Sequence, residues 1–187
     1  MLTKLFVTVC VAALLCIVCI RNGEKTDGVI RGFVEKNIEA LLMGVVVFLA
    51  CYVRVKLLDY ESGDYVYYEQ WYEYLKAHGG IAGLKDDIGN YMEGYMLFLA
   101  LLTYFPVKLL YGIKVFSVLF DFLTAFLVQK MVRGYFTGNY NRMIANICFA
   151  FTLFVPTIIF NSAYWGQCDS IYTFFLICSI YCYGKEK

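Results

Sequence analysis

Proline and histidine are scarce in this sequence. It contains two prolines and one histidine, and it has no low-complexity linker and no internal repeat. His78, the single histidine, stands beside Gly79 and Gly80 and is typical of a loop, so no Ser-His-Asp set can be assembled. Neither a GxGxxG motif nor a phosphate-binding loop is present. The net charge is only +1, which gives no basic field and argues against nucleic acid as a partner.

The chain has eight cysteines, but they do not form the framework of a secreted disulfide scaffold. Most of them lie inside apolar runs, where cysteine behaves as a small hydrophobic residue. Cys16 and Cys19 are three positions apart, but no histidine or acid accompanies them on their apolar stretch. A metal site is therefore not expected there.

Apolar residues dominate the chain. The hydrophobic share is 61%, the aromatic share is 19% and the mean hydropathy is +0.63, well above the values of a soluble domain. A membrane-spanning helix needs roughly 20 apolar residues. We predict spans in five apolar runs: Leu5–Ile20, Ile38–Leu58, Ile113–Val132, Ile144–Phe160 and Ile171–Tyr183. The first run also fits a signal peptide, but Arg21, Asn22 and Gly23 follow it without a small-residue cleavage site, which favours a retained helix.

A sixth apolar run, Tyr91–Phe105, is too short to cross easily and carries Glu93 near its start. Basic residues without acids mark the link 130–142 as cytoplasmic. Arg21–Lys36, with four basic residues, and the tail with Lys185 and Lys187 are assigned to the same side. These assignments agree only if Tyr91–Phe105 does not cross. We therefore predict an outer loop from Asp59 to about Gly112, with interfacial helices at Tyr67–Lys76 and Tyr91–Phe105, and a second outer segment at Asn161–Asp169.

Acidic and aromatic residues gather in the first predicted outer loop. Three carboxylates, Asp59, Glu61 and Asp64, are followed by six aromatic residues within ten positions. An aromatic belt at headgroup depth explains the rings. It does not explain the acids, because carboxylates at this depth are costly unless they are solvated or paired. Gly63 and Asp64 also form a turn signal that can project the carboxylate, so Asp64 is a candidate functional residue.

Four stretches occur in the order found in bacterial GPI-mannosyltransferase-like proteins, which belong to the GT-C class of integral-membrane glycosyltransferases: SGDYVYYEQWYEYLKAHGG, GNYMEGYMLFLALLTYFP, IKVFSVLFDFLTAFLV and NSAYWGQCDSIY. The chain resembles this family from about Val53 to its last residue. Two departures stand out. Met92-Glu93-Gly94 replaces a proline-containing stretch of the family, and family members have more helices. The chain thus resembles an N-terminal half, and a missing C-terminal half is an expected partner.

The resemblance implies a sugar transfer on the outer face. GT-C enzymes use a lipid-phosphate sugar donor, and an early outer-loop carboxylate acts as general base; Asp64 matches that position. We count Tyr65, next to it, and Asn90 and Tyr91, in the GNYMEGY cluster, as substrate-binding candidates. Because charge grows on the leaving phosphate, a nearby cation would help. Lys114 can supply it, or can simply extend to the lipid headgroups.

Asp121 follows Lys114 by seven residues, on roughly the same helix face. It is a candidate binding residue, or it makes a polar contact to another helix.

FNSAYWGQCDSIY, at 160–172, concentrates polar groups between two apolar runs. Asn161, Trp165, Gln167 and Asp169 can bind sugar hydroxyls or orient Asp64. Asp169 resembles a metal-holding acid of related oligosaccharyltransferases and would be the ligand of a divalent metal, although none is expected. Asp169 can also cap the helix that follows.

We therefore expect an all-α, polytopic membrane helix bundle with interfacial helices in its long first outer loop. Residues 1–37 form an N-terminal helix and cytoplasmic link, and residues 38–187 form part of the transferase module. The expected function is transfer of a hexose, mannose above others, from a polyprenyl-phosphate donor to an acceptor hydroxyl outside a bacterial plasma membrane. A non-catalytic split subunit, scaffold or small transport protein is the alternative.

Overall fold

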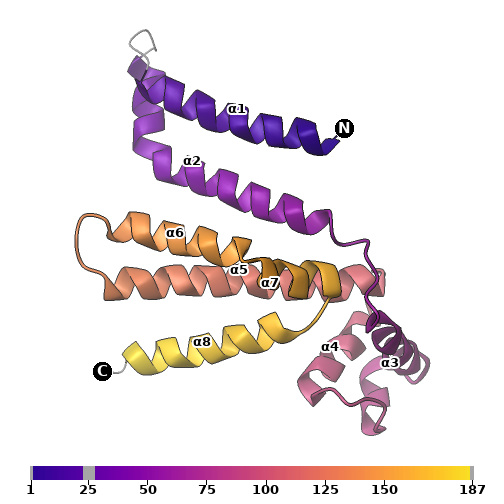
Figure 1. Ribbon diagram of the computed structural model, residues 1–187. Coiled ribbons are helices and arrows are strands. Elements are labelled where there is room, and N and C mark those ends of the chain that lie inside the picture. The colour runs from indigo at the N-terminus through magenta and orange to yellow at the C-terminus, as the bar shows by residue number, and fades with distance from the viewer. Residues whose placement is uncertain (1, 23–27, 186–187) are drawn as a thin grey trace. The chain divides into compact units, whose positions relative to one another are not determined.

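The computed structural model describes residues 2–22 and 28–185, and every regular element in these ranges is a helix (Figure 1). The chain divides into two units, Met1–Val53 and Arg54–Lys187. The first unit holds helix α1, Leu2–Asn22, and nearly all of helix α2, Gly28–Val55. Lys25 and Lys187, which contribute to the predicted cytoplasmic charge, lie outside the described residues. The all-α prediction is confirmed for the described ranges.

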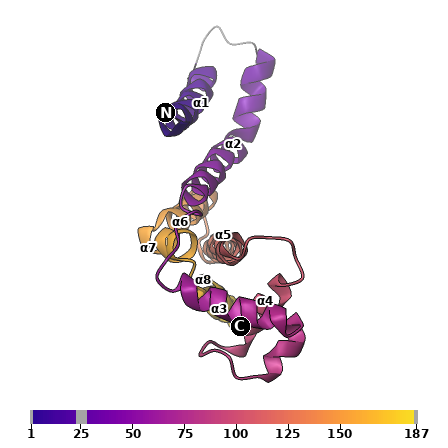
Figure 2. The ribbon, with the colours of Figure 1, turned by 90° about the vertical axis from the view of Figure 1, so that its right-hand side faces the viewer.

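The second unit is built around helix α5, Leu109–Tyr135, whose 27 residues extend over about 40 Å. Helices α6, Asn141–Phe154, and α8, Asp169–Lys185, pack along it on different sides (Figure 1). Helix α3, Tyr65–Ala77, and helix α4, Glu93–Leu102, lie together near the N-terminal end of α5, joined by the 3₁₀ turn η1, Gly80–Lys85 (Figure 2).

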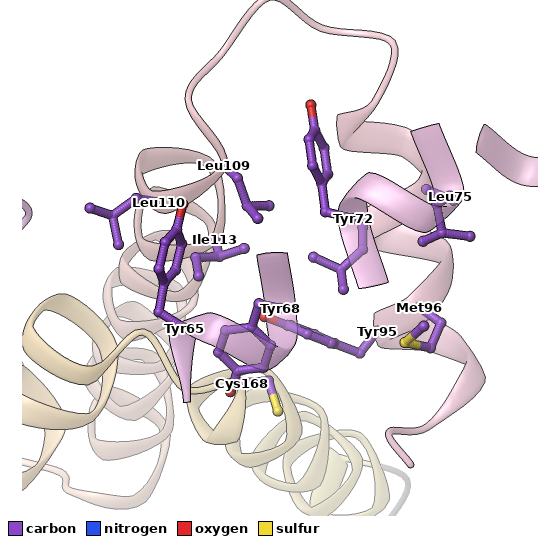
Figure 3. Packing of buried hydrophobic residues seen from close by; sticks show 12 residues of the cluster. Tyr65, Tyr68, Tyr72, Leu75, Tyr95, Met96, Leu109, Leu110, Ile113 and Cys168 are labelled. Carbon is purple, nitrogen blue, oxygen red and sulfur yellow. The ribbon is translucent and has the colours of Figure 1, made fainter. Parts of the chain in front are cut away.

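An aromatic core holds α3 and α4 against α5 (Figure 3). The α3 side chains Tyr65, Tyr68, Tyr72 and Leu75 recur at intervals of three and four residues, so they share one helix face, and all four are buried. They meet buried residues of α4 and the first turns of α5: Tyr95, Met96, Leu99, Ala100, Leu109, Leu110 and Ile113. Burial of each large side chain contributes on the order of 1.5–3 kcal/mol. Three of the tyrosines predicted as a membrane belt are thus core residues.

Two helices, α2 and α5, are long and apolar enough to cross a membrane, among the residues that the structure describes. A third span results if α6 and the segment after it are counted together, across a bend of 50°. Two or three of the five predicted spans are therefore supported by helix length and composition in the described residues. The described apolar part of α1 is Cys10–Ile20, and α8 has 17 residues, about 26 Å, which is short of a 30 Å hydrocarbon core. Helix α4 has ten residues, about 15 Å, half of that thickness.

Pro156 causes the bend after α6. It has no N–H to continue the helix, and it leaves Val155 extended at φ −60° and ψ 120°. Pro156 then starts the short helix α7, Pro156–Ile159, at the position where proline is tolerated. A π-helical turn, η2, Phe160–Trp165, follows directly. The apolar run Ile144–Phe160, predicted as one span, is thus divided between α6 and α7 and ends at the first residue of η2, which forms part of the polar link before α8.

Candidate functional site

Asp64 and the 165–167 segment are joined by hydrogen bonds across about a hundred residues of sequence. The indole Nε1 of Trp165 donates to Asp64 Oδ2 at 2.8 Å, and the amide Nε2 of Gln167 donates to the same oxygen. Asp64 precedes helix α3, but its side chain makes no capping bond to that helix. Its other oxygen, Oδ1, accepts no hydrogen bond from the described residues, and the side chain is partly exposed. The carboxylate is therefore oriented through one oxygen and open at the other.

The backbone around Gly166 aims the two donors at Asp64. Gly166 has a φ of +80°, in the left-handed region that glycine enters without steric cost, and it ends the π-helical turn η2. The N–H groups of Gly166 and Gln167 both donate to the Asn161 carbonyl at 3.0 Å. Because π-helical turns displace a residue out of the regular ladder, they occur often at functional sites. Here the turn places Trp165 and Gln167 on the Asp64 side.

The side-chain amide and the backbone carbonyl of Gln167 are both engaged in hydrogen bonds. Its Oε1 accepts hydrogen bonds from the Tyr68 and Tyr91 phenols, each at 3.1 Å, and its backbone carbonyl accepts one from Ser117 Oγ at 2.8 Å. With Oε1 occupied by two donors, Nε2 must face Asp64. Burial raises the pKa of Tyr68 and of Tyr91 above the ordinary value of a phenol, so both remain protonated donors at neutral pH.

Asp169 lies on a neighbouring open depression of about 550 Å³. Its Oδ2 accepts a hydrogen bond from Asn161 Nδ2 at 2.8 Å. The depression is lined by Thr157, Phe160, Asn161, Trp165, Gln167 and Asp169. Asp64 is not one of the lining residues, but two of them, Trp165 and Gln167, donate to it. Asp169 is the first residue of α8, and its carboxylate accepts its hydrogen bond from the Asn161 side chain, which precedes that helix.

Lys114 is fully buried at 0% exposure, near the start of α5. Its ammonium group donates to the carbonyl oxygens of Leu57, Leu58 and Tyr60, which uses the three hydrogens that a lysine has. The ring of Tyr60 then stacks on Tyr164, with 3.7 Å between centroids. Lys114 thus anchors the start of the first loop, a different role from the phosphate contact or the headgroup contact predicted for it.

Asp121 forms a buried ion pair with Arg54, whose Nε and Nη2 both lie 3.0 Å from Asp121 Oδ2. Ser162 Oγ donates to the same oxygen at 2.5 Å, and Arg54 Nη2 also donates to the Leu153 carbonyl at 3.0 Å. That carbonyl belongs to the last turn of α6, where backbone acceptors lack helical partners. Asp121 therefore makes the polar contact between helices that was one of its two predicted roles.

The other predicted binding residues differ in whether they contact the site. Tyr91 joins the Gln167 network, whereas Asn90 beside it is exposed and Tyr65 is buried in the aromatic core. Among the described residues, no group of three histidine, cysteine or acidic side chains could hold a metal ion. The Asp169 carboxylate accepts a hydrogen bond from the Asn161 amide.

Arg54, Ser117, Ser162 and Tyr68 are site residues that sequence reasoning missed. Arg54 lies inside the apolar run Ile38–Leu58, and an arginine in such a run is itself a signal of a buried partner. Ser117 stands between Lys114 and Asp121 at helical spacing, which places it on the same face. Nothing in the sequence distinguishes Tyr68 from the five aromatic residues around it.

Chemically, the arrangement offers one oriented carboxylate, Asp64, with an open oxygen that can accept a proton. Beside it lies a depression that combines an indole face, two amides and a second carboxylate, groups that pair with hydroxyl-bearing ligands.

In comparisons with protein families, with curated proteins and with solved structures, no match to this chain was found, and no family membership follows.

Proposed function

We propose that this chain is the sugar-handling part of a membrane glycosyltransferase, with Asp64 as general base. The supporting observation is the Asp64 carboxylate, held on Oδ2 by Trp165 and Gln167 and open on Oδ1. In the proposed reaction, Oδ1 takes the proton of an acceptor hydroxyl while that oxygen attacks the anomeric carbon of a hexose. The bond between that carbon and the lipid phosphate breaks, and the phosphate leaves with the electron pair.

The depression next to Asp64 is the proposed place for the hexose. The Trp165 indole is 40% exposed and offers an apolar face to a sugar ring. Asn161, Gln167 and Asp169 offer donors and acceptors for hydroxyl groups. Since no lining residue is a cation and Lys114 is occupied by carbonyls, we assign only the sugar to the depression and leave the phosphate unassigned.

The rest of the proposal concerns the membrane. We propose a polytopic helix bundle in a bacterial plasma membrane, with α3 and α4 at the outer interface and the Asp64 site on the outer face. The supporting features are the two helices of spanning length, the short apolar α4, and the acid-free link 130–142. The donor is a polyprenyl-phosphate hexose, mannose above others, and the acceptor is a glycan or lipid hydroxyl.

A second candidate is a non-catalytic subunit or scaffold, because the Asp64 hydrogen bonds can serve only to connect two segments of the fold. Its hydrogen bonds tie the start of α3 to the segment before α8. In that case the same bonds stabilise the fold and no sugar binds.

The first experiment measures donor binding to the purified chain in nanodiscs. The sequence has two tryptophans, and the Trp71→Phe variant leaves Trp165 as the only indole reporter. We expect saturable quenching of Trp165 fluorescence by a short-chain polyprenyl-phosphate mannose, and little by free polyprenyl phosphate. Equal quenching by the sugar-free lipid, or none by either, would overturn the sugar assignment.

The second experiment measures transfer to a lipid acceptor in membranes that carry the chain. Asp64→Asn keeps an acceptor for Trp165 and Gln167 but loses the base, so we expect transfer to fall by about 10²–10⁴-fold with donor binding retained. Glu73→Gln, an exposed acid on α3, is the matched control and should transfer normally. Equal transfer by Asp64→Asn and wild type would exclude Asp64 as the base.

A further inference from the structure

Helix α5 carries a stripe of polar side chains along one buried face. Lys114, Ser117, Asp121 and Thr124 follow one another at intervals of three, four and three residues, which places them on a common face. None is more than 5% exposed. In an apolar helix of spanning length, such a face must meet other polar groups or a filled cavity.

The polar atoms at the N-terminal end of the stripe have hydrogen-bond partners, and two atoms at its C-terminal end have none. Lys114 and Ser117 donate to backbone carbonyls, and Asp121 Oδ2 accepts from Arg54 and Ser162. By contrast, Asp121 Oδ1 and Thr124 Oγ1 are buried and make no hydrogen bond with the described residues. Buried polar atoms without partners are rare, and each asks for an explanation such as a bound ion.

Both unpaired atoms belong to side chains that line a small recess of about 190 Å³. The walls come from α5, α7, η2 and α8, and the polar side chains are Asp121, Thr124, Thr157, Asn161, Asp169, Ser170 and Thr173. The polar groups are two carboxylates, four hydroxyls and one amide, so nearly all of the polar atoms are oxygens, while Ile158 and side-chain carbons form the larger, apolar part of the wall. The amide nitrogen of Asn161 is already directed to Asp169. Hard cations prefer such oxygen ligands.

The recess lies deep and beside a broken helix. Asp121 is 12 residues from the first residue of α5 and 14 from the last, about 18 Å and 21 Å along the helix. The neighbouring helix is interrupted at Pro156 and bends by 50°. Interrupted helices near the middle of a membrane are a recurrent setting for coupling cations. Thr157, Asn161 and Asp169 also line the open depression, which gives the recess a polar entrance.

We propose that this recess binds one monovalent cation of about the size of Na⁺, coordinated by Asp121 Oδ1, Thr124 Oγ1 and further oxygens of the lining. The charges support a single positive ion: Asp121 and Asp169 carry two negative charges, Arg54 balances one of them, and one remains. The Arg54 guanidinium occupies Asp121 Oδ2, so the ion approaches the opposite oxygen. The recess shares Asn161 and Asp169 with the proposed sugar depression, but the residues that carry its two unpaired atoms, Asp121 and Thr124, do not line that depression, so the cation site can be tested without sugar transfer.

Thermal unfolding of the purified chain in nanodiscs tests the site, with NaCl, KCl and choline chloride compared at one ionic strength. We expect the Tm to rise with Na⁺ and to saturate. At a Na⁺ concentration ten times the Kd, the ratio of folded to unfolded chain should be about 11-fold higher than in choline. Binding of ²²Na⁺ should saturate near one ion per chain.

Thr124→Val removes the unpaired hydroxyl with little change in shape, so Na⁺ should no longer raise the Tm or bind. Thr152→Val is the matched control, since the Thr152 hydroxyl donates to the Cys148 carbonyl away from the recess. The same Tm in all three salts for the wild type would overturn the proposal, and so would an unchanged Na⁺ effect in Thr124→Val. Stabilisation by glycerol but not by Na⁺, lost in Thr124→Val, would identify a hydroxyl-bearing ligand instead and also overturn it.

Discussion

Replacing Lys114 by methionine separates an anchoring lysine from a phosphate-binding one. Methionine keeps the length and apolar contacts of the lysine stem and deletes only the ammonium group. The carbonyls of Leu57, Leu58 and Tyr60 then lose their donor. A buried acceptor left without a partner costs about 1–3 kcal/mol. If water reaches one of the three carbonyls and not the other two, the expected loss of stability is about 2–6 kcal/mol.

A loss of this size should be visible in a thermal unfolding scan. For a chain of this length, 1 kcal/mol corresponds to about 2–4 °C in Tm, so Lys114→Met should unfold at least about 4 °C below wild type. Lys108→Met is the matched control, because Lys108 is exposed and lies 3.6 Å from Glu61 in a surface pair. Such a pair contributes about 0–1 kcal/mol. A wild-type Tm for Lys114→Met, combined with weakened binding of a lipid phosphate, would refute the anchoring role.

Three further variants test other parts of the second unit. Gly166→Ala should destabilise the chain by about 1–2 kcal/mol, since the backbone is left-handed there, and should weaken the Asp64 contacts; Gly63→Ala, with open space around its Cβ position, should be neutral in the same denaturation assay. Arg54→Met and Asp121→Leu should each cost about 3–5 kcal/mol, and the double variant should recover most of the loss; additive losses in the double-mutant cycle would contradict a direct pair. Cys168 is 3% exposed and burial raises its thiol pKa, so the reactive thiolate is depleted and N-ethylmaleimide should label Cys168 only on unfolding; rapid labelling of the folded chain, read by mass spectrometry, would argue against the packed core.

Local patterns in the sequence were enough to predict the helices but not their limits. A helix was predicted at Tyr67–Lys76, and α3, Tyr65–Ala77, forms there because its buried residues repeat at helical spacing. The run 144–160 looked like one span because hydropathy averages over Pro156, whereas the missing N–H of that proline divides the helix. The spacing of apolar residues does not show where a proline ends one helix and changes the direction of the next.

The candidate site was predictable as a set of residues but not as a set of bonds. Asp64, Trp165 and Gln167 were all predicted, and one of the expected roles, orientation of Asp64 by the second segment, matches the hydrogen bonds that join them. Neither predicted role of Lys114, a phosphate contact or a headgroup contact, included its actual acceptors, because the sequence does not show that the carbonyls of Leu57, Leu58 and Tyr60 lie beside it. Arg54 was missed because its partner, Asp121, is 67 residues away.

The bond between Gln167 and Asp64 spans 103 residues, and this separation bears on how the chain is made. A ribosome adds about 5–20 residues per second, so Asp64 leaves it roughly 5–20 s before Gln167 is synthesised. During that interval α3 can pack against α4 and α5, which are made before Gln167, but Asp64 has neither of its two side-chain donors. The segment that completes the pair also leads into α8, so closure of the site coincides with formation of the last described helix. Synthesis stalled just before Gly166 would therefore yield a chain with every earlier helix in place and an unassembled Asp64 site.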